Sequence, residues 1–199
     1  MFTGFVGPAA LTAAISGQYF ASPSAGQIAR LVGAISGGRR SCPVVLVLAN
    51  YTGDRLNFGL AKEALTLAGY ADVRMVVFGD DLTPYLSTTT NGEEEEGCEN
   101  TKESAAAESI QQSRRRGLAG IAFVHRIAGA MSEEGATAAA IERRLNSLSS
   151  LVYTLSISLS AVDIPGVGAS FSLPADQMEL GLGVHGESGI ERMGVKPAR

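Results

Sequence analysis

The chain has 199 residues, of which 45% are hydrophobic and 18% are charged, so it is long enough to bury one sizeable core. Its net charge of −4 excludes a general attraction to nucleic acid or anionic membranes, because that attraction needs clustered Lys and Arg. Cys42 and Cys98 are too few for a disulfide framework, and no apolar run reaches the roughly 20 residues of a membrane-spanning helix, so we expect a cytoplasmic protein.

The first two predicted elements are helices. Pro8 suits the first turn of a helix and Gly17 suits its end, which predicts a short helix between them. Apolar residues then recur at three- and four-residue spacing over residues 28–35. The Ser-Pro-Ser stretch at residues 22–24 offers caps, so we expect a second helix there.

A βαβ unit follows. Residues 43–48 form a continuous branched apolar run, which is typical of a strand buried on both faces of a parallel sheet. Leucines over residues 56–67 predict a helix, and residues 73–78 predict a second buried strand. The sequence therefore indicates an α/β fold with a mostly parallel sheet flanked by helices and a right-handed crossover.

Residues 83–104 break this pattern with a run of threonines, an Asn-Gly pair and four consecutive glutamates. Such a polar tract cannot bury enough apolar surface to order itself, so we expect a disordered acidic surface insertion. A solvated loop is favoured here over a metal or basic-partner site. The three arginines at residues 114–116 are likewise interpreted as a solvated face.

The last 80 residues change character along their length. Residues 117–131 fit either a single helix or a strand followed by a turn, with the helix favoured, and residues 137–153 predict a further helix. Apolar residues then alternate over 155–159 and again over 178–184. This alternation predicts additional strands in the C-terminal third.

The loop Asn-Tyr-Thr-Gly-Asp at residues 50–54 is the first candidate site. It follows a buried strand directly, which places it at the carboxyl end of a parallel sheet, where α/β proteins form ligand crevices. Asp54 is a candidate general base toward a substrate hydroxyl, and Gly53 lets the backbone approach a small ligand. The alternative is that Asp54 only caps the following helix.

His185 is the second candidate. It follows a predicted strand and lies between Gly183, Gly186 and Glu187, so little bulk surrounds its ring. A neutral imidazole there can attack a carbonyl, with Glu187 to orient it, although a turn or core histidine is the competing interpretation. His125 lies in an apolar stretch and is interpreted as a structural residue of a helix.

Several familiar sites have no counterpart in the sequence. No Gly-x-Gly-x-x-Gly opens a helix after a strand, and no Walker-type phosphate loop is present, so we expect no ATP site in this chain. No Gly-x-Ser-x-Gly elbow and no metal-ligand spacing of His, Cys and carboxylates occurs. The pattern thus disfavours hydrolases and zinc enzymes.

Five motifs together resemble the dihydroxyacetone kinase family, also called glycerone kinases or triokinases. They are Phe-Ala-Ser-Pro-Ser at 20–24, Asn-Tyr-Thr-Gly-Asp-Arg-Leu-Asn-Phe-Gly at 50–59, Gly-Asp-Asp at 79–81, Arg-Arg-Gly-Leu-Ala-Gly at 115–120 and Met-Glu-Leu-Gly-Leu-Gly-Val-His-Gly-Glu at 178–187. The resemblance covers nearly the whole chain apart from the acidic insertion. It implies that residues 1–199 are part of one dihydroxyacetone-binding kinase domain.

The resemblance also implies roles for individual residues. His185 matches the histidine that forms a hemiaminal with the ketone carbon of dihydroxyacetone, and Asp54 matches the base on the hydroxyl that is phosphorylated. Thr52 and Gly53 are implied to contact the substrate, which is dihydroxyacetone or glyceraldehyde. The complete enzyme is implied to use ATP and Mg, with none bound by this chain, and to form a homodimer.

Three departures limit what the resemblance carries over. The family has a Gly-rich segment with a second histidine upstream of the Phe-Val-Gly matched at residues 5–7, and often has Lys where Ala49 stands here. Beyond Arg199 the family continues with more of this domain, and an ATP-binding domain or a phosphate-donating partner completes it. We therefore expect this chain to hold only the substrate-binding part, with a degenerate ketose-binding or regulatory protein as the alternative.

Overall fold

The computed structural model describes residues 3–90 and 114–197, without the side chains of residues 87–90. The chain divides into two compact units. Unit 1 comprises Met1–Asp80 and Arg116–Val152, and unit 2 comprises Asp81–Arg115 and Tyr153–Arg199. Within the described residues, no helix is long and apolar enough to cross a membrane.

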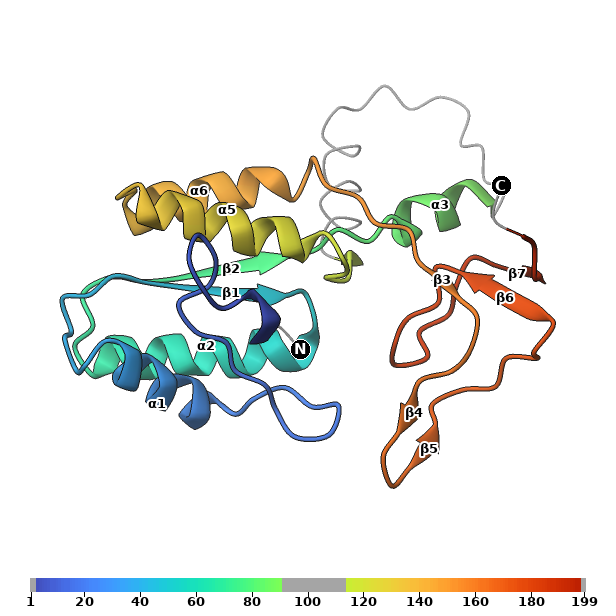
Figure 1. Ribbon diagram of the computed structural model, residues 1–199, viewed down its shortest axis with the longest axis horizontal. Helices are drawn as coiled ribbons and strands as arrows, with labels where there is room; N and C mark the ends of the chain where they lie inside the picture. Colours follow the sequence, from blue (N-terminus) through green and yellow to red (C-terminus); the bar gives the residue numbers. More distant parts are fainter. Residues whose placement is uncertain (1–2, 91–113, 198–199) are drawn as a thin grey trace. The chain divides into compact units, whose positions relative to one another are not determined.

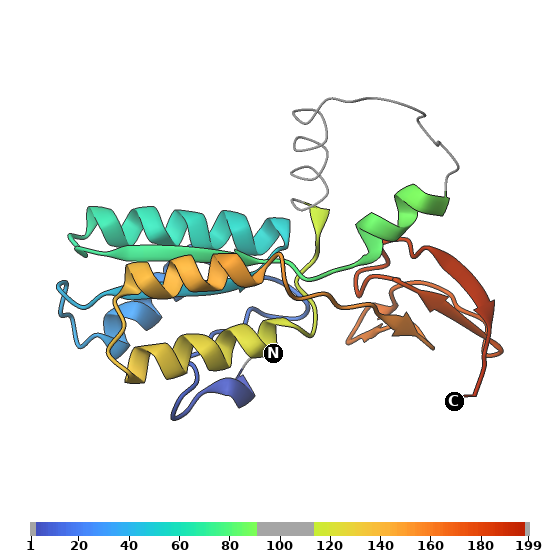
Figure 2. The same cartoon turned by 90° about the horizontal axis from the view of Figure 1, so that it is seen from above.

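Unit 1 is a three-layered α/β structure (Figure 1). Its elements are η1 (Thr3–Phe5), α1 (Ala25–Ile35), β1 (Val44–Ala49), α2 (Thr52–Leu67), β2 (Val73–Phe78), α5 (Ile121–Glu133) and α6 (Ala138–Leu148). β1 and β2 lie between α1 and α2 on one face and α5 and α6 on the other, and α5 and α6 run side by side (Figure 2). This arrangement confirms the predicted α/β class.

β1 and β2 pair in parallel, in register from Val44 opposite Val73 to Ala49 opposite Phe78. Val44 and Leu46 belong to the apolar cluster with α1 and α2, whereas Val45, Val47 and Ala49 belong to the cluster with α5 and α6. Alternate residues thus point into different layers, which explains why the strand is apolar throughout. Among the described residues this parallel sheet has two strands only, fewer than the mostly parallel sheet predicted.

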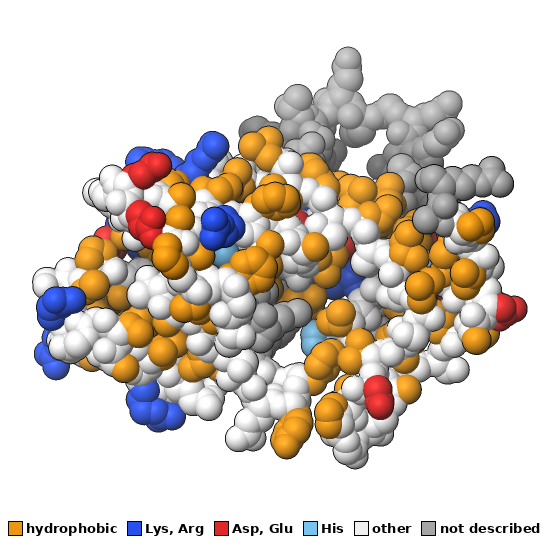
Figure 3. All heavy atoms as spheres, in the orientation of Figure 1, with side chains coloured by type: hydrophobic (Ala, Val, Ile, Leu, Met, Phe, Trp, Pro, Cys, Tyr) orange, Lys and Arg blue, Asp and Glu red, His pale blue; other side chains and the backbone are white. Residues whose placement is uncertain are grey.

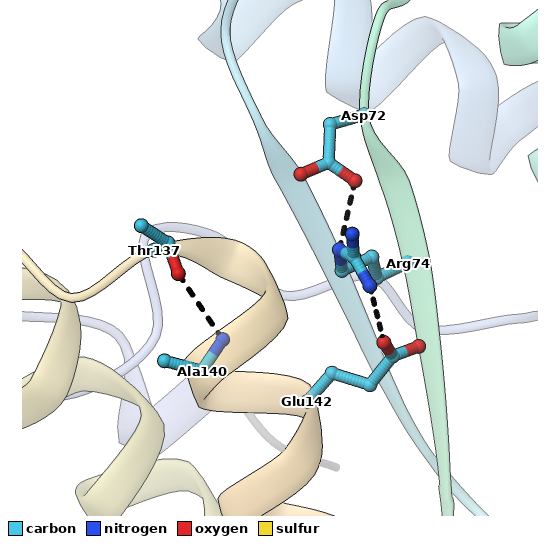
Figure 4. Close-up of polar contacts among 5 residues, drawn as sticks. All are labelled: Asp72, Arg74, Thr137, Ala140 and Glu142. Carbon is cyan, nitrogen blue, oxygen red and sulfur yellow. Dashed lines mark hydrogen bonds and ion pairs between the residues drawn. The ribbon is translucent and has the colours of Figure 1, made fainter.

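Local signals explain how the helices of unit 1 begin and how the layers are joined. Ser24 accepts the Gln27 backbone N–H, and the Gln27 side chain returns to the Ser24 N–H, forming a capping box at α1. Thr137 caps α6 through the Ala140 N–H (Figure 4). Arg74 of β2 contacts Glu142 of α6 at 2.6 Å and Asp72 at 2.8 Å, which ties the sheet to that helix.

The helix predicted between Pro8 and Gly17 is wrong. Residues 6–20 form an irregular segment. The Leu11 N–H donates a hydrogen bond to Phe5 O at 2.9 Å near its start. Its backbone at Ala10 packs directly on Gly129 of α5, where a Cβ would approach Ala10 atoms to 2.2–2.4 Å. Close packing against α5 therefore overrides the local helix signals.

Unit 2 contains one helix and short strands. Its described elements are α3 (Thr83–Thr90), β3 (Ile157–Ser158), β4 (Asp163–Ile164), β5 (Gly168–Ala169), β6 (Gln177–Leu180) and β7 (Glu191–Gly194). β3, β6 and β7 form an antiparallel sheet in the order β3-β6-β7, and β4 pairs with β5. These strands confirm the prediction of additional strands in the C-terminal third.

The disordered insertion predicted over residues 83–104 does not begin at residue 83. Residues 83–90 form α3, and the Asp81 carboxylate accepts the Thr83 N–H at 2.9 Å at its start. Asp81 thus caps the start of α3, which the sequence analysis did not predict. The rest of that prediction, residues 91–104, lies outside the described residues.

Arg115 corrects the interpretation of the three arginines as a solvated face. It is fully buried, and its guanidinium carbon lies 4.5 Å from the centre of the Tyr153 ring and 5.7 Å from that of Tyr85. Its Nε donates to Asp81 O at 3.1 Å. Arg115 is therefore a buried cation stacked on aromatic rings, in a unit whose interior contains few apolar side chains.

Candidate functional site

Asp54 lies in the first turn of α2, directly after the carboxyl end of β1. The N-cap residue is Tyr51, and no side chain forms a capping hydrogen bond there. The Asp54 side chain is half-buried beside the N-terminus of α2. Of the two interpretations of Asp54, helix cap and general base, the geometry thus disfavours the helix cap.

Gly53 brings two of the sequence motifs together in unit 1. A Cβ on Gly53 would lie 2.8 Å from the Ser22 hydroxyl oxygen, so the Phe-Ala-Ser-Pro-Ser segment passes close over the start of α2. Thr52 and Gly53 are exposed beside Asp54. Sequence reasoning did not select Ser22 as a site residue, although it lies within a recognised motif next to this loop.

His185 lies in the loop between β6 and β7 and not at the end of a strand, because β6 ends at Leu180. Gly181 follows with φ of +76°, a conformation that suits glycine and stops the strand. The loop then closes on itself, since Gly183 N–H donates to Glu187 O at 2.8 Å and Gly186 N–H to Gly183 O at 3.0 Å. The His185 side chain is 45% exposed at this turn.

Glu187 holds His185 at two points. One carboxylate oxygen accepts the His185 backbone N–H, and the other lies 3.0 Å from the ring Nδ1. Burial alone would raise the pKa of Glu187, but hydrogen bonds from the Glu187 and His185 backbones and the interaction with the His185 ring lower it. An ionised carboxylate only accepts hydrogen bonds, so a ring with its proton on Nδ1 would donate to Glu187 and keep its lone pair on Nε2.

Glu179 anchors the same loop from β6. Its carboxylate accepts the Gly189 N–H at 3.0 Å and two guanidinium N–H groups of Arg192 at 2.8 and 3.1 Å. The Arg192 hydrogen bond lowers the pKa of Glu179, with the Gly189 N–H adding to it against the opposing effect of burial. Glu179 is 8% exposed and joins β6 to β7 across the base of the His185 loop.

His125 is a fully buried residue of α5, as its interpretation as a structural residue implied. Its ring packs edge-on against Phe5, with centroids 5.4 Å apart. Burial lowers its pKa to about 4, so the ring is neutral at pH 7.

The Gly-Asp-Asp motif has a structural role in unit 1. The fully buried Asp80 carboxylate accepts the Leu118 N–H at 2.6 Å and the Gly120 N–H at 2.7 Å. Gly117 lies so close to the strand ends that a Cβ would approach Ala49 to 2.6 Å. Asp80 of the Gly-Asp-Asp motif thus orders the turn at residues 117–120, which belongs to another of the five motifs.

The predicted site residues fall into two groups. Thr52, Gly53 and Asp54 lie together in unit 1, whereas His185 and Glu187 lie together in unit 2. Over residues 3–90 and 114–197, no three His, Cys, Asp or Glu side chains are grouped as a metal site would require.

The mixed α/β fold of this chain is that of the dihydroxyacetone kinases. A family model described as the Dak1 domain matches residues 1–97 and 100–199. The chain belongs to this family, as the five motifs predicted.

Named relatives agree with this assignment. The chain is 37% identical over 194 residues to rat triokinase/FMN cyclase, a match that covers 98% of this chain and 29% of the relative. It is 35% identical over 196 residues to the dihydroxyacetone-binding subunit DhaK of a PTS-dependent dihydroxyacetone kinase from Listeria innocua, covering 98% of this chain and 52% of that subunit. The chain thus spans only about a third to a half of these proteins.

Solved structures show the same fold. The dihydroxyacetone kinase of C. freundii, solved with AMP-PNP and Mg2+, matches with a TM-score of 0.72 at 32% identity, over 96% of this chain and 30% of that one. A dihydroxyacetone kinase operon co-activator, Dha-DhaQ, matches with a TM-score of 0.75 at 28% identity, over 98% of this chain and 52% of that one. The same architecture therefore occurs in a kinase and in a co-activator.

Proposed function

We propose that this chain is the substrate-holding part of a dihydroxyacetone kinase and that it binds dihydroxyacetone, or glyceraldehyde, through a covalent bond to His185. The observation that carries the proposal is the double contact of Glu187 with the His185 backbone and ring in a member of this family. That contact orients the ring and favours a proton on Nδ1, which leaves the lone pair on Nε2.

The binding step is an addition to the carbonyl. The lone pair of His185 Nε2 attacks the carbonyl carbon, a C–N bond forms, and the C=O π electrons move to oxygen, which takes a proton. The ring loses its Nδ1 proton to Glu187, 3.0 Å away, and Glu187 releases a proton to solvent as solvent protonates the oxygen, so the adduct is a neutral hemiaminal with the full mass of the substrate. Glycerol has no carbonyl to attack, so this bond discriminates against it.

Asp54 is proposed to remove the proton from the substrate hydroxyl that receives phosphate, with Thr52 and Gly53 contacting the substrate. Its position in the first turn of α2, directly after β1, supports this role. In the complete protein, ATP with Mg supplies the phosphoryl group, bound by another domain, or a phosphate-donating partner takes its place. The complete protein is proposed to be a homodimer.

The adduct is tested with dihydroxyacetone labelled with ¹³C at the carbonyl. Binding moves the ¹³C resonance from the ketone range to that of a saturated carbon, and native intact mass rises by one whole substrate. His185→Ala should abolish both signals, Glu187→Gln should weaken them, and Asp54→Asn should retain them. A folded wild-type chain without adduct, or a full adduct in His185→Ala, would overturn the proposal.

The likeness to an operon co-activator favours a second candidate, a ketose-binding regulatory protein without catalysis. Both candidates predict the adduct, so the adduct does not separate them. Phosphate transfer to dihydroxyacetone by the complete protein, lost in Asp54→Asn, supports the kinase. Saturable adduct formation with no transfer, in the presence of ATP and Mg, supports the regulator.

A further inference from the structure

The loop that carries His185 joins β6 to β7 over residues 181–190 and is rich in glycine. Glycine loses more conformational freedom on ordering than any other residue, so such a loop needs contacts that fix it. The hydrogen bonds of Gly183, Gly186 and Glu187 join residues of the loop to one another. The direction of the His185 ring therefore also depends on how the loop is attached to the strands beside it.

The end of this loop is attached to β6 through Gly189. The Gly189 N–H donates to the Glu179 carboxylate at 3.0 Å. Its backbone lies so close to β6 that a Cβ at this position would approach Leu180 O to 2.4 Å and Glu179 Oε1 to 2.9 Å. Because Gly189 follows Glu187 by two residues, Glu179 holds the backbone next to the carboxylate that meets the His185 ring.

Glu179 uses its two carboxylate oxygens for different partners. Oε1 accepts the Gly189 N–H, whereas Oε2 accepts the Arg192 Nε at 3.1 Å and Nη2 at 2.8 Å. The lowered pKa of Glu179 keeps both oxygens as acceptors at neutral pH. A glutamine of the same length has one acceptor oxygen in place of two, so the two contacts can be separated by substitution.

The gain in stability from an ion pair does not by itself explain why Glu179 is buried. Its side chain is 10% exposed, and burying an ionised carboxylate has a cost that the pairing only offsets. Apolar side chains in place of a buried ion pair are often neutral or stabilising. An apolar side chain at position 179 would, however, leave the Gly189 N–H without this acceptor. The contact with the loop is thus what a carboxylate adds here.

We propose that Glu179 is a positioning residue for His185: its Oε1 fixes the Gly189 backbone and so holds Glu187 where its carboxylate meets the His185 ring. This inference rests on the proposed function, in which Nε2 of that ring attacks the substrate carbonyl. Glu179 acts through Gly189 and Glu187 and not on the substrate. Without the Gly189 contact, the stretch 187–189 is free to shift, and the ring is aligned for attack less often.

Four substitutions in the full chain test this role. Glu179→Ala removes both contacts, whereas Arg192→Met removes the cation and leaves the Gly189 contact. Glu179→Gln keeps an acceptor for the Gly189 N–H, because the Arg192 side chain is 49% exposed and can turn to water. The matched control is Glu191→Ala, which removes an exposed carboxylate of β7 opposite Leu180.

Three measurements are made on each variant. The affinity for ¹³C-labelled dihydroxyacetone follows the adduct, and amide exchange at Gly189 shows whether its hydrogen bond is present. The ¹⁵N resonances of the His185 ring, recorded without substrate, show which nitrogen carries the proton. Denaturant unfolding confirms that each variant is folded.

Glu179→Ala should weaken the adduct by roughly tenfold or more, and the other three variants should stay within about threefold of wild type. Exchange at Gly189 should speed up in Glu179→Ala, and the ring resonances should lose the pattern of a proton on Nδ1 held by Glu187. A merely structural role would lower the free energy of unfolding and leave the ring resonances of the folded chain unchanged.

Folded Glu179→Ala with wild-type adduct affinity and ring resonances would overturn the proposal. An equal loss of adduct in Arg192→Met, with Gly189 exchange unchanged, would also overturn it, because the ion pair would then position the ring. If Glu179→Ala does not fold, adduct affinity that fails to follow Gly189 exchange across Glu179→Gln and Arg192→Met has the same force. A wild-type chain that forms no adduct refutes the proposed function, whereas the ring resonances still test the positioning.

Discussion

The two units of the chain are stabilised in different ways. Among the described residues, 17 of the 18 buried hydrophobic side chains belong to unit 1, and Leu182 is the one from unit 2. Unit 2 instead buries Asp81, Thr83, Arg115 and Glu179, while its apolar side chains are widely exposed (Figure 3). Apolar packing thus dominates the interior of unit 1, which also buries Ser36, Asp80 and His125, whereas charged and hydrogen-bonded contacts dominate that of unit 2.

This difference explains what each unit can provide to a site. A close-packed α/β layer fixes Asp54 on a rigid helix start. The His185 loop depends on specific polar partners, Glu187 and Glu179, so its geometry is tied to their ionisation.

The largest expected effect is in the core of unit 1. Leu145→Ala removes a fully buried side chain of α6 and should lower the free energy of unfolding by about 3 kcal/mol. The matched change in unit 2, Leu159→Ala, alters a side chain that is 60% exposed and should cost less than about 0.5 kcal/mol. Denaturant unfolding followed by circular dichroism measures both, and similar losses would refute the contrast.

A second test uses the pH dependence of unit 1. His125 has a folded pKa of about 4, below its ordinary 6.5, so the unfolded chain takes up the proton first as pH falls. Its contribution to stability is complete above pH 6.5 and is lost between pH 6.5 and 4. The loss should be about 2 kcal/mol, because solvent screens part of the charge on the ring.

His125→Leu should remove this slope. The pKa values of Glu179 and Glu187 are also lowered, so carboxylates of unit 2 add a loss of stability at more acidic pH in both proteins. The difference between wild type and variant isolates the histidine. Parallel curves over pH 4 to 6.5 would show that His125 does not titrate as the structure implies.

The smallest expected effect tests the polar core of unit 2. Arg115→Met keeps an unbranched side chain but loses the stacking on Tyr153 and Tyr85 and the hydrogen bond to Asp81 O. It should cost about 1–2 kcal/mol and speed amide exchange in unit 2. Arg114→Met, at an exposed neighbour, is the control and should leave exchange unchanged.

Unit 1 could be predicted well from the sequence because its signals are local. β1, α2 and β2 follow from continuous apolar runs and leucine spacing, and Ser24 marks the start of α1. The prediction of a helix between Pro8 and Gly17 failed because packing of Ala10 on Gly129, 119 positions away, decides the conformation of this segment. Asp54 was placed correctly after β1, since the end of a buried strand is readable from sequence.

Unit 2 was predicted less well because its stabilising contacts join residues far apart in the chain. The burial of Arg115 depends on Tyr153, and the anchoring of the His185 loop depends on Glu179 and Arg192. Alternation extended the predicted strand to Val184, but Gly181 ends β6 at Leu180. Hydrophobic patterns carry no information on such ion pairs and turns.

Gly129 has a consequence for how this sequence can vary. Any side chain at position 129 would collide with the backbone of Ala10, and a backbone cannot rotate out of the way as a side chain can. A larger residue there is compatible with this structure only if residues 9–11 follow another path. Among relatives, the identity of position 129 and the length of the segment before α1 should therefore covary.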